Sequence, residues 1–250
     1  MANVFDSLAR KKQYKYPYLF LGCYLTFLLS TVCLANKLTV VGNLLVPGGI
    51  FVFVFTFCIC DIVGEVYGYA YPRLFIWIGV LTEILFSLIV ILVSHTSSPA
   101  YFQQAESYKI VFDPTIRYVF SGLAALLTGE FVNVYLLAKW KILLRGKLFI
   151  FRSLISTAVG QASLTIIVDI LNYTGKMNTH DLIWMMLSGY SWKMACAILL
   201  VFPAWIIVRY LKKVESVDYY DINTNFNPFI LSLENNEIFD SNNSVELKTS

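Results

Sequence analysis

Six long apolar runs constrain this chain more than any other feature of its sequence. A helix rises about 1.5 Å per residue and the hydrocarbon core of a bilayer is about 30 Å thick, so one crossing needs roughly 20 mostly apolar residues. The runs cover residues 17–36, 47–68, 72–94, 115–140, 149–173 and 182–210. They are too long for membrane β-strands and show no alternation with a period of two. The sequence therefore predicts an all-α protein, a six-helix transmembrane bundle.

The composition supports a lipid environment. Of 250 residues, 58% are hydrophobic and only 14% are charged, which is more apolar than the surface of a water-soluble domain tolerates. The formal net charge of +3 is too small to indicate a nucleic-acid partner. We therefore expect the lipid bilayer as the surrounding partner and no bound nucleic acid, and the sequence gives no indication of the oligomeric state.

Lysine and arginine are distributed unequally between the two sides of this layout. One side holds most of them, namely Arg10, Lys11, Lys12, Lys15, Arg73, Lys139, Lys141, Arg145, Lys147, Arg152, Arg209, Lys212 and Lys213. The other side holds Lys37, Lys109, Arg117 and Lys176. Because loops that stay in the cytoplasm carry the excess of these residues, we expect both termini to be cytoplasmic and the protein to be a multi-pass protein of the cell inner membrane.

The spans divide the chain into three parts. We expect a cytoplasmic segment at 1–16, a six-span transporter domain at 17–213 and a cytoplasmic tail at 214–250 whose end, from about Glu234, is disordered. Reading the first span as a cleaved signal peptide is the alternative, but its removal would place the later basic loops outside. Between the third and fourth spans, turn formers such as Pro99 and Pro114 predict a polar loop without helix.

Several ionisable side chains lie within the spans, where each costs at least about 2.5 kcal/mol. Asp61 and Glu65 are four residues apart and share a helix face, as do Glu130 and Asn133 at three apart. Lys193 lies deep in the last span and needs a partner inside, for which we expect a carboxylate of the second or fourth span. Further polar residues in the spans are Glu83, Gln161, Asp169 and Asn172. We expect the polar groups to converge on a central cavity, the alternative being that they only anchor or pack the helices.

The cysteines and histidines do not form a metal-binding or disulfide pattern. All five cysteines lie within apolar runs, where a thiol behaves as a small hydrophobic group: Cys23, Cys33, Cys58, Cys60 and Cys196. His95 and His180 are in separate polar segments. We therefore expect no metal site, no disulfide and no cofactor.

Short motifs of unusual composition are spread over nearly the whole chain. The most specific is an acidic pair followed by Tyr-Gly at the end of an apolar run. The motifs are Ala35-Asn36-Lys37, Asp61-Ile62-Val63-Gly64-Glu65-Val66-Tyr67-Gly68, Gly129-Glu130-Phe131-Val132-Asn133, Arg152 with Gly160-Gln161, Tyr190 to Lys193 with Pro203, and Asn225-Phe226-Asn227-Pro228. These motifs resemble those of the queuosine precursor transporter family, also called the VUT family. One departure is Leu164, where many members have Asp.

The resemblance implies import of 7-deazaguanine precursors of queuosine, such as 7-cyano-7-deazaguanine, 7-aminomethyl-7-deazaguanine or queuine. A guanine-like base offers two N–H donors that a buried carboxylate accepts, and Asn or Lys donates to its carbonyl. Asp61 would carry a proton, and Tyr67 or Tyr190 would cover the ring. The candidate substrate-binding residues are Asn36, Asp61, Glu65, Tyr67, Glu130, Asn133, Gln161, Tyr190 and Lys193.

The mechanism expected for such a bundle is alternating access, without a covalent step. The chain has no Walker-type loop, so we do not expect it to hydrolyse ATP, while an intramembrane carboxylate permits proton coupling. Two alternatives stay open. One is the substrate-binding membrane subunit of a multi-component vitamin-type importer, and the other is a multi-pass enzyme that acts on lipid with these carboxylates as acid and base.

Overall fold

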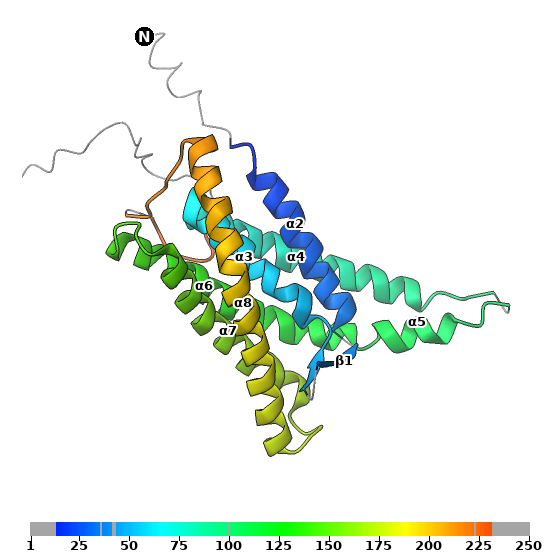
Figure 1. The fold of residues 1–250 in the computed structure, drawn as a ribbon. Helices are drawn as coiled ribbons and strands as arrows, with labels where there is room; N and C mark the ends of the chain where they lie inside the picture. The colour runs from blue at the N-terminus through cyan, green and yellow to red at the C-terminus, as the bar shows by residue number, and fades with distance from the viewer. Residues whose placement is uncertain (1–13, 36, 42–43, 100, 223, 232–250) are drawn as a thin grey trace, which may run out of the picture.

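The fold is a bundle of six long helices, seen in a computed structural model that describes residues 14–35, 37–41, 44–99, 101–222 and 224–231 (Figure 1). The long helices are α2 (Pro17–Leu34), α3 (Ile50–Tyr67), α4 (Ala70–Ser94), α6 (Thr115–Leu143), α7 (Phe149–Tyr173) and α8 (Thr179–Glu215). Each is long and apolar enough to cross a membrane. The predicted all-α bundle of six membrane helices is therefore confirmed.

The two ends of the bundle differ in character. The backbone N–H of Lys15 donates to the Glu215 carboxylate at 2.8 Å, so α2 begins where α8 ends. We call this end the basic end, because most of the lysines and arginines that the structure describes lie there. The opposite end carries a two-stranded antiparallel hairpin of β1 (Leu38–Val41) and β2 (Leu44–Pro47), and we call it the hairpin end.

Helix α3 is the most buried of the six spans, with 72% of its length inside the protein. It packs against α2, α4, α6, α7 and α8. Figure 1 shows it running through the middle of the bundle. Asp61 and Glu65, both on α3, are therefore buried in the interior of the bundle.

Helices α6 and α7 cross at two glycines. A Cβ atom added to Gly160 would lie only 2.6 Å from the carbonyl oxygen of Gly129. Small residues at such a crossing let two backbones approach closely, which compensates for the weak driving force between helices in lipid. The crossing brings the polar residues that follow the two glycines, Glu130 and Gln161, into the same layer of the bundle.

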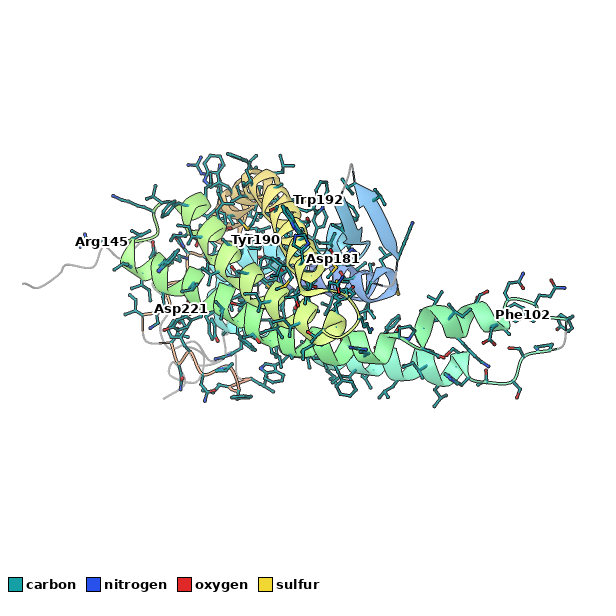
Figure 2. All side chains as sticks on the ribbon, turned by 90° about the horizontal axis from the view of Figure 1, so that it is seen from below. Phe102, Arg145, Asp181, Tyr190, Trp192 and Asp221 are labelled. Atoms are coloured by element: carbon teal, nitrogen blue, oxygen red, sulfur yellow. The ribbon has the colours of Figure 1, made fainter. Side chains whose placement is uncertain are left out.

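The connection between α4 and α6 contains helix α5 (Ala105–Phe112), so the expectation of a loop without helix is wrong for these residues. The turn formers bound the helix and do not interrupt it: Pro99 precedes it, and Asp113 and Pro114 follow it. α5 and the end of α4 project from the bundle (Figures 1 and 2). Figure 2 shows Phe102 at the far tip of this projection and Arg145 at the opposite side of the molecule.

After α8 the chain returns across the basic end. The N–H of Tyr219 donates to the Val66 carbonyl at 3.3 Å, and the Asp221 carboxylate accepts the N–H of Tyr69 at 3.0 and 3.1 Å. The first residues of the predicted cytoplasmic tail, 214–250, are therefore held against the basic end of the bundle. Asn36, the first 13 residues and the chain beyond 231 lie outside the described residues.

Candidate functional site

A cavity of about 150 Å³ lies among the helices toward the hairpin end. Most of its wall is apolar, and a cavity of this volume holds roughly one small aromatic ring. The polar part of the wall comes from four helices and includes Thr31 on α2, Glu83 on α4, then Thr165, Asp169 and Asn172 on α7, and Lys193 on α8. An apolar pocket with a few convergent polar groups is the usual form of a small-molecule site.

Lys193 is the cation of this cavity and is only 7% exposed. Its Nζ donates to Thr165 Oγ1 at 2.9 Å and lies 5.9 Å from the centre of the Phe53 ring. Among the described residues no carboxylate comes within 4.0 Å of it, and Asp169 interacts with it from farther away. An ammonium group has three donors, so the contact with Thr165 leaves two for a bound solute.

Spacing along α7 explains why its polar residues share the cavity. Thr165, Asp169 and Asn172 are separated by four and three residues and therefore lie on one helix face. The Asn172 side-chain oxygen accepts a hydrogen bond from the Ser121 hydroxyl at 2.7 Å, which joins α7 to α6 beside the cavity. This face was readable from the sequence, although only Lys193 of the cavity was among the candidate residues.

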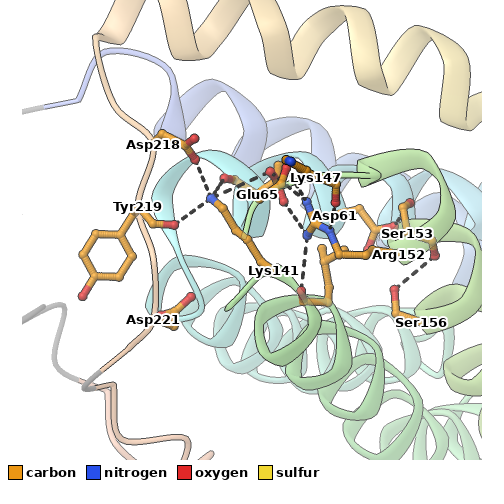
Figure 3. A network of polar contacts seen from close by, with 12 residues as sticks. Asp61, Glu65, Lys141, Lys147, Arg152, Ser153, Ser156, Asp218, Tyr219 and Asp221 are labelled. Carbon is orange, nitrogen blue, oxygen red and sulfur yellow. Dashed lines mark hydrogen bonds and ion pairs between the residues drawn. The ribbon is translucent and has the colours of Figure 1, made fainter. Parts of the chain in front are cut away.

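The opposite, basic end is closed by an ion-pair network around Glu65 (Figure 3). Arg152 donates to both carboxylate oxygens of Glu65, at 2.9 and 3.2 Å, and Lys212 donates to one of them at 2.6 Å. Lys141 donates to the Glu65 carbonyl at 2.6 Å and to Asp218 at 2.6 Å. We call these five residues the Glu65 cluster. It ties α3, α6, α7, α8 and the returning chain together.

Asp218 is the second carboxylate of the Glu65 cluster. It contacts Lys141 at 2.6 Å and Lys212 at 2.9 Å. Partial burial disfavours its charged form, but the two lysines more than offset this effect and hold the pKa of Asp218 below its ordinary value. Two carboxylates thus face three cations, and Asp218 stays ionised at neutral pH.

A second polar layer lies between the Glu65 cluster and the cavity. Asn133 donates to one oxygen of Asp61 at 2.7 Å, while the hydroxyls of Ser153 and Thr157 donate to the other, Thr157 at 3.2 Å. Asp61, Ser153 and Thr157 also line a small cavity of about 20 Å³. Asp61 is therefore held by neutral donors from α6 and α7 and not by a cation.

Glu130 forms a third layer on α6. One of its oxygens accepts hydrogen bonds from the Tyr24 hydroxyl at 2.9 Å and the Cys60 thiol at 3.4 Å. Its other oxygen, and the side-chain oxygen of Gln161, are buried without a hydrogen-bond partner among the described residues. Unsatisfied buried acceptors are uncommon and mark places where a water, proton or ligand fits.

The structure separates the predicted site residues into groups. Lys193 lines the main cavity, Asp61 and Asn133 contact each other, Glu65 belongs to the ion-pair network, and Glu130 and Gln161 lie between. The Tyr67 hydroxyl faces Glu215 at 3.4 Å, and the Tyr190 hydroxyl donates to the Ala158 carbonyl at 3.3 Å. Asn36 is outside the described residues. The expected single cavity shared by all these groups is not seen, because the cations of the basic end close around Glu65.

Some partners were not recognisable as such from the sequence. Arg152, Lys141 and Lys212 look like ordinary basic residues of the loops, yet Arg152 and Lys141 are 0% and 1% exposed. Position gives a partial signal, because Arg152 lies inside the apolar run 149–173, whereas Lys141 and Lys212 lie just beyond the ends of the runs 115–140 and 182–210. Tyr24, which reaches Glu130 from α2, gives no sequence signal of this role.

Comparison with known proteins gives one match. A family model described as "putative vitamin uptake transporter" matches residues 47–208, which is more than half of the chain. The matched stretch runs from the end of β2 into α8 and includes the described polar residues of the cavity and of the Asp61 and Glu130 layers except Tyr24 and Thr31, which lie on α2. No curated protein and no solved structure was found to match.

Proposed function

From the premise that this chain belongs to the vitamin uptake transporter family, we propose that it imports 7-deazaguanine precursors of queuosine across the inner membrane by alternating access. The observation that carries the proposal is the contrast between the two halves of the bundle. The hairpin half contains a cavity with polar groups, and the basic half is closed by the Glu65 cluster. This arrangement is expected of a carrier in a conformation that is closed toward one side of the membrane and accessible from the other.

The chemistry of the cavity fits a small planar base. Asp169 supplies a carboxylate that accepts the paired N–H donors of a guanine-like edge, and Lys193 supplies donors for its carbonyl. The apolar wall, which includes Phe53, accommodates the ring. Many family members have Asp at the position of Leu164. In this chain Asp169 supplies a carboxylate instead, since both residues line the cavity from α7.

Opening of the basic half would require the Glu65 cluster to separate. Its ion pairs join α3, α6, α7 and α8, so their rearrangement changes how these helices pack. With cytoplasmic termini, the basic end faces the cytoplasm and the cavity faces the periplasm. Solute would then enter from the hairpin side and leave after the cluster opens.

A cellular measurement tests the solute. Queuosine in tRNA is measured in a strain that cannot make the precursors, supplied with a low external concentration of 7-cyano-7-deazaguanine, with and without this gene. We expect queuosine only when the gene is present. Equal queuosine in both strains would rule out this solute.

Reconstitution tests the mechanism. Purified protein in liposomes should exchange internal unlabelled for external labelled 7-cyano-7-deazaguanine without any other chain. A requirement for separate ATPase subunits would support the importer-subunit alternative. Turnover of a lipid by the purified protein, abolished in Asp61→Asn, would support the enzyme alternative.

A further inference from the structure

Four buried carboxylates lie in successive layers from the cavity to the basic end, and we call them the carboxylate row. Glu83 lines the cavity on α4, Glu130 follows on α6, and Asp61 and Glu65 follow on α3. Each is close enough to the next for their charges to interact: Glu83 with Glu130, Glu130 with Asp61, and Asp61 with Glu65. The row spans the layers that separate the cavity from the Glu65 cluster.

Only the last carboxylate of this row has cations around it. Glu65 contacts Lys141, Lys212 and Arg152, whereas within the described chain no lysine, arginine or histidine lies within 4.0 Å of Glu83, Glu130 or Asp61. Ionised carboxylates without cations are very costly in a low-dielectric interior, and several of them in sequence repel one another. Bound protons remove both costs.

Glu83 distinguishes this row from a simple packing cluster. Its side chain is 6% exposed, faces the cavity and makes no hydrogen bond or ion pair with any residue that the structure describes. A buried carboxylate with a purely structural role is expected to accept hydrogen bonds, as Asp61 does from Asn133, Ser153 and Thr157. Glu83 is therefore free to bind something that enters through the cavity.

We propose that Glu83, Glu130 and Asp61 are the proton pathway of this carrier, with Glu83 as the site where the proton enters. The inference rests on the proposed transport function and adds its coupling ion. A hydronium ion in the cavity gives its proton to Glu83. The proton then passes as an O–H hydrogen to Glu130 and on to Asp61, directly or through a water molecule, and is released to water when the Glu65 cluster opens. One proton moves, and each carboxylate ends as it began.

Charged and titratable groups face Glu83 from all helices around it. Tyr24 of α2 and Glu130 of α6 interact with it electrostatically, and Asp169 of α7 and Lys193 of α8 share its cavity. Cys60 and Asp61 of α3 belong to the next layers. Solute bound to Lys193 and Asp169 would therefore be in the same cavity as the proton on Glu83, which gives a physical basis for coupling.

The test uses purified full-length protein in liposomes and two transport modes. Accumulation of labelled 7-cyano-7-deazaguanine is measured with an imposed pH gradient, acidic outside, and exchange is measured without a gradient. We expect Glu83→Gln to lower gradient-driven accumulation about 100-fold, as for loss of a positioned proton-transfer group, and to leave exchange nearly unchanged. The matched control is Glu106→Gln on the projecting α5, which should accumulate solute like the wild type.

Three outcomes overturn the pathway. They are wild-type accumulation that ignores the pH gradient, wild-type accumulation that follows a sodium gradient instead, and full gradient-driven accumulation by Glu83→Gln. If the wild type exchanges no 7-cyano-7-deazaguanine, the proposed solute is wrong. The infrared measurement, which needs no solute, then tests the proton site by itself. The infrared C=O band of protonated carboxyl groups should weaken in Glu83→Gln but not in Glu106→Gln, and an unchanged band refutes the proton site.

Discussion

Arg152 and Glu65 form a two-point contact in the interior of the bundle, with N–O distances of 2.9 and 3.2 Å. Arg152 is at the start of α7 and Glu65 is near the end of α3, so the contact ties two helices that are far apart in sequence. The Nε of Arg152 also donates to the Lys147 carbonyl at 2.9 Å, which fixes the guanidinium in place (Figure 3). Planar two-point pairing of this kind is specific to arginine, and lysine does not reproduce it.

Replacing Glu65 by Gln should destabilise the protein strongly. The change leaves the buried guanidinium of Arg152 without its counter-charge and removes one of the two carboxylates near Lys141, and breaking a buried pair costs about 3–5 kcal/mol. The free energy of unfolding in detergent, followed by tryptophan fluorescence, measures the loss. The double variant Glu65→Gln with Arg152→Met should recover part of it, and additive losses would contradict direct coupling of the two side chains.

Replacing Lys193 by Met should impair transport and leave folding intact. The side chain keeps its length, the hydrogen bond to Thr165 is lost, and the solute loses a charged donor. A hydrogen bond to a charged group is worth about 1.5–3 kcal/mol, so apparent solute affinity should fall roughly 10- to 100-fold. Solute exchange in liposomes measures the effect, and Lys213→Met, at an exposed site on the same helix, should exchange normally. Normal affinity in Lys193→Met would exclude the lysine from the site.

Replacing Gly160 by Ala should weaken the contact between α6 and α7. The new Cβ would lie 2.6 Å from the Gly129 carbonyl oxygen and 2.9 Å from Asn133 Cβ, so the helices must move apart. Overpacking of this kind costs about 1–3 kcal/mol. The midpoint of thermal unfolding in detergent should therefore fall. Gly22→Ala is the matched control, because a Cβ there meets nothing within 4 Å, and equal midpoints in the two variants would disprove the steric account.

Acidification should weaken the cover over the basic end through Asp218. Lys141 and Lys212 hold its pKa below the ordinary value in the folded protein, against the effect of burial. Its contribution is therefore complete above the unfolded pKa of about 4 and is lost as the pH falls below that value. The stability difference between wild type and Asp218→Asn should shrink on going from neutral pH to about pH 3. For Asp113→Asn, at the exposed pair with His95, the difference should stay small throughout.

Cysteine labelling should establish the orientation. In a variant whose native cysteines are replaced, Lys176→Cys at the hairpin end should react with a membrane-impermeant maleimide in intact cells whose outer membrane is permeable. Lys213→Cys at the basic end should react only after the inner membrane is opened. Lys176 precedes the first residue of α8 and Lys213 lies in its last turn, so the two sites report opposite sides. The reverse pattern would place the cavity on the cytoplasmic side.

The sequence determined that this chain is a bundle of six membrane helices, because runs of about 20 apolar residues have few other stable forms in lipid. It also located most of the buried polar residues, since ionisable groups in such runs are costly enough to be conspicuous. Which of these groups contact each other was decided only by the tertiary structure. Lys193 was expected to pair with a carboxylate of the second or fourth span and instead donates to Thr165, while Glu65 is enclosed by Arg152, Lys141 and Lys212. These contacts depend on how the helices cross and on where the chain returns after α8, and no local pattern in the sequence records either.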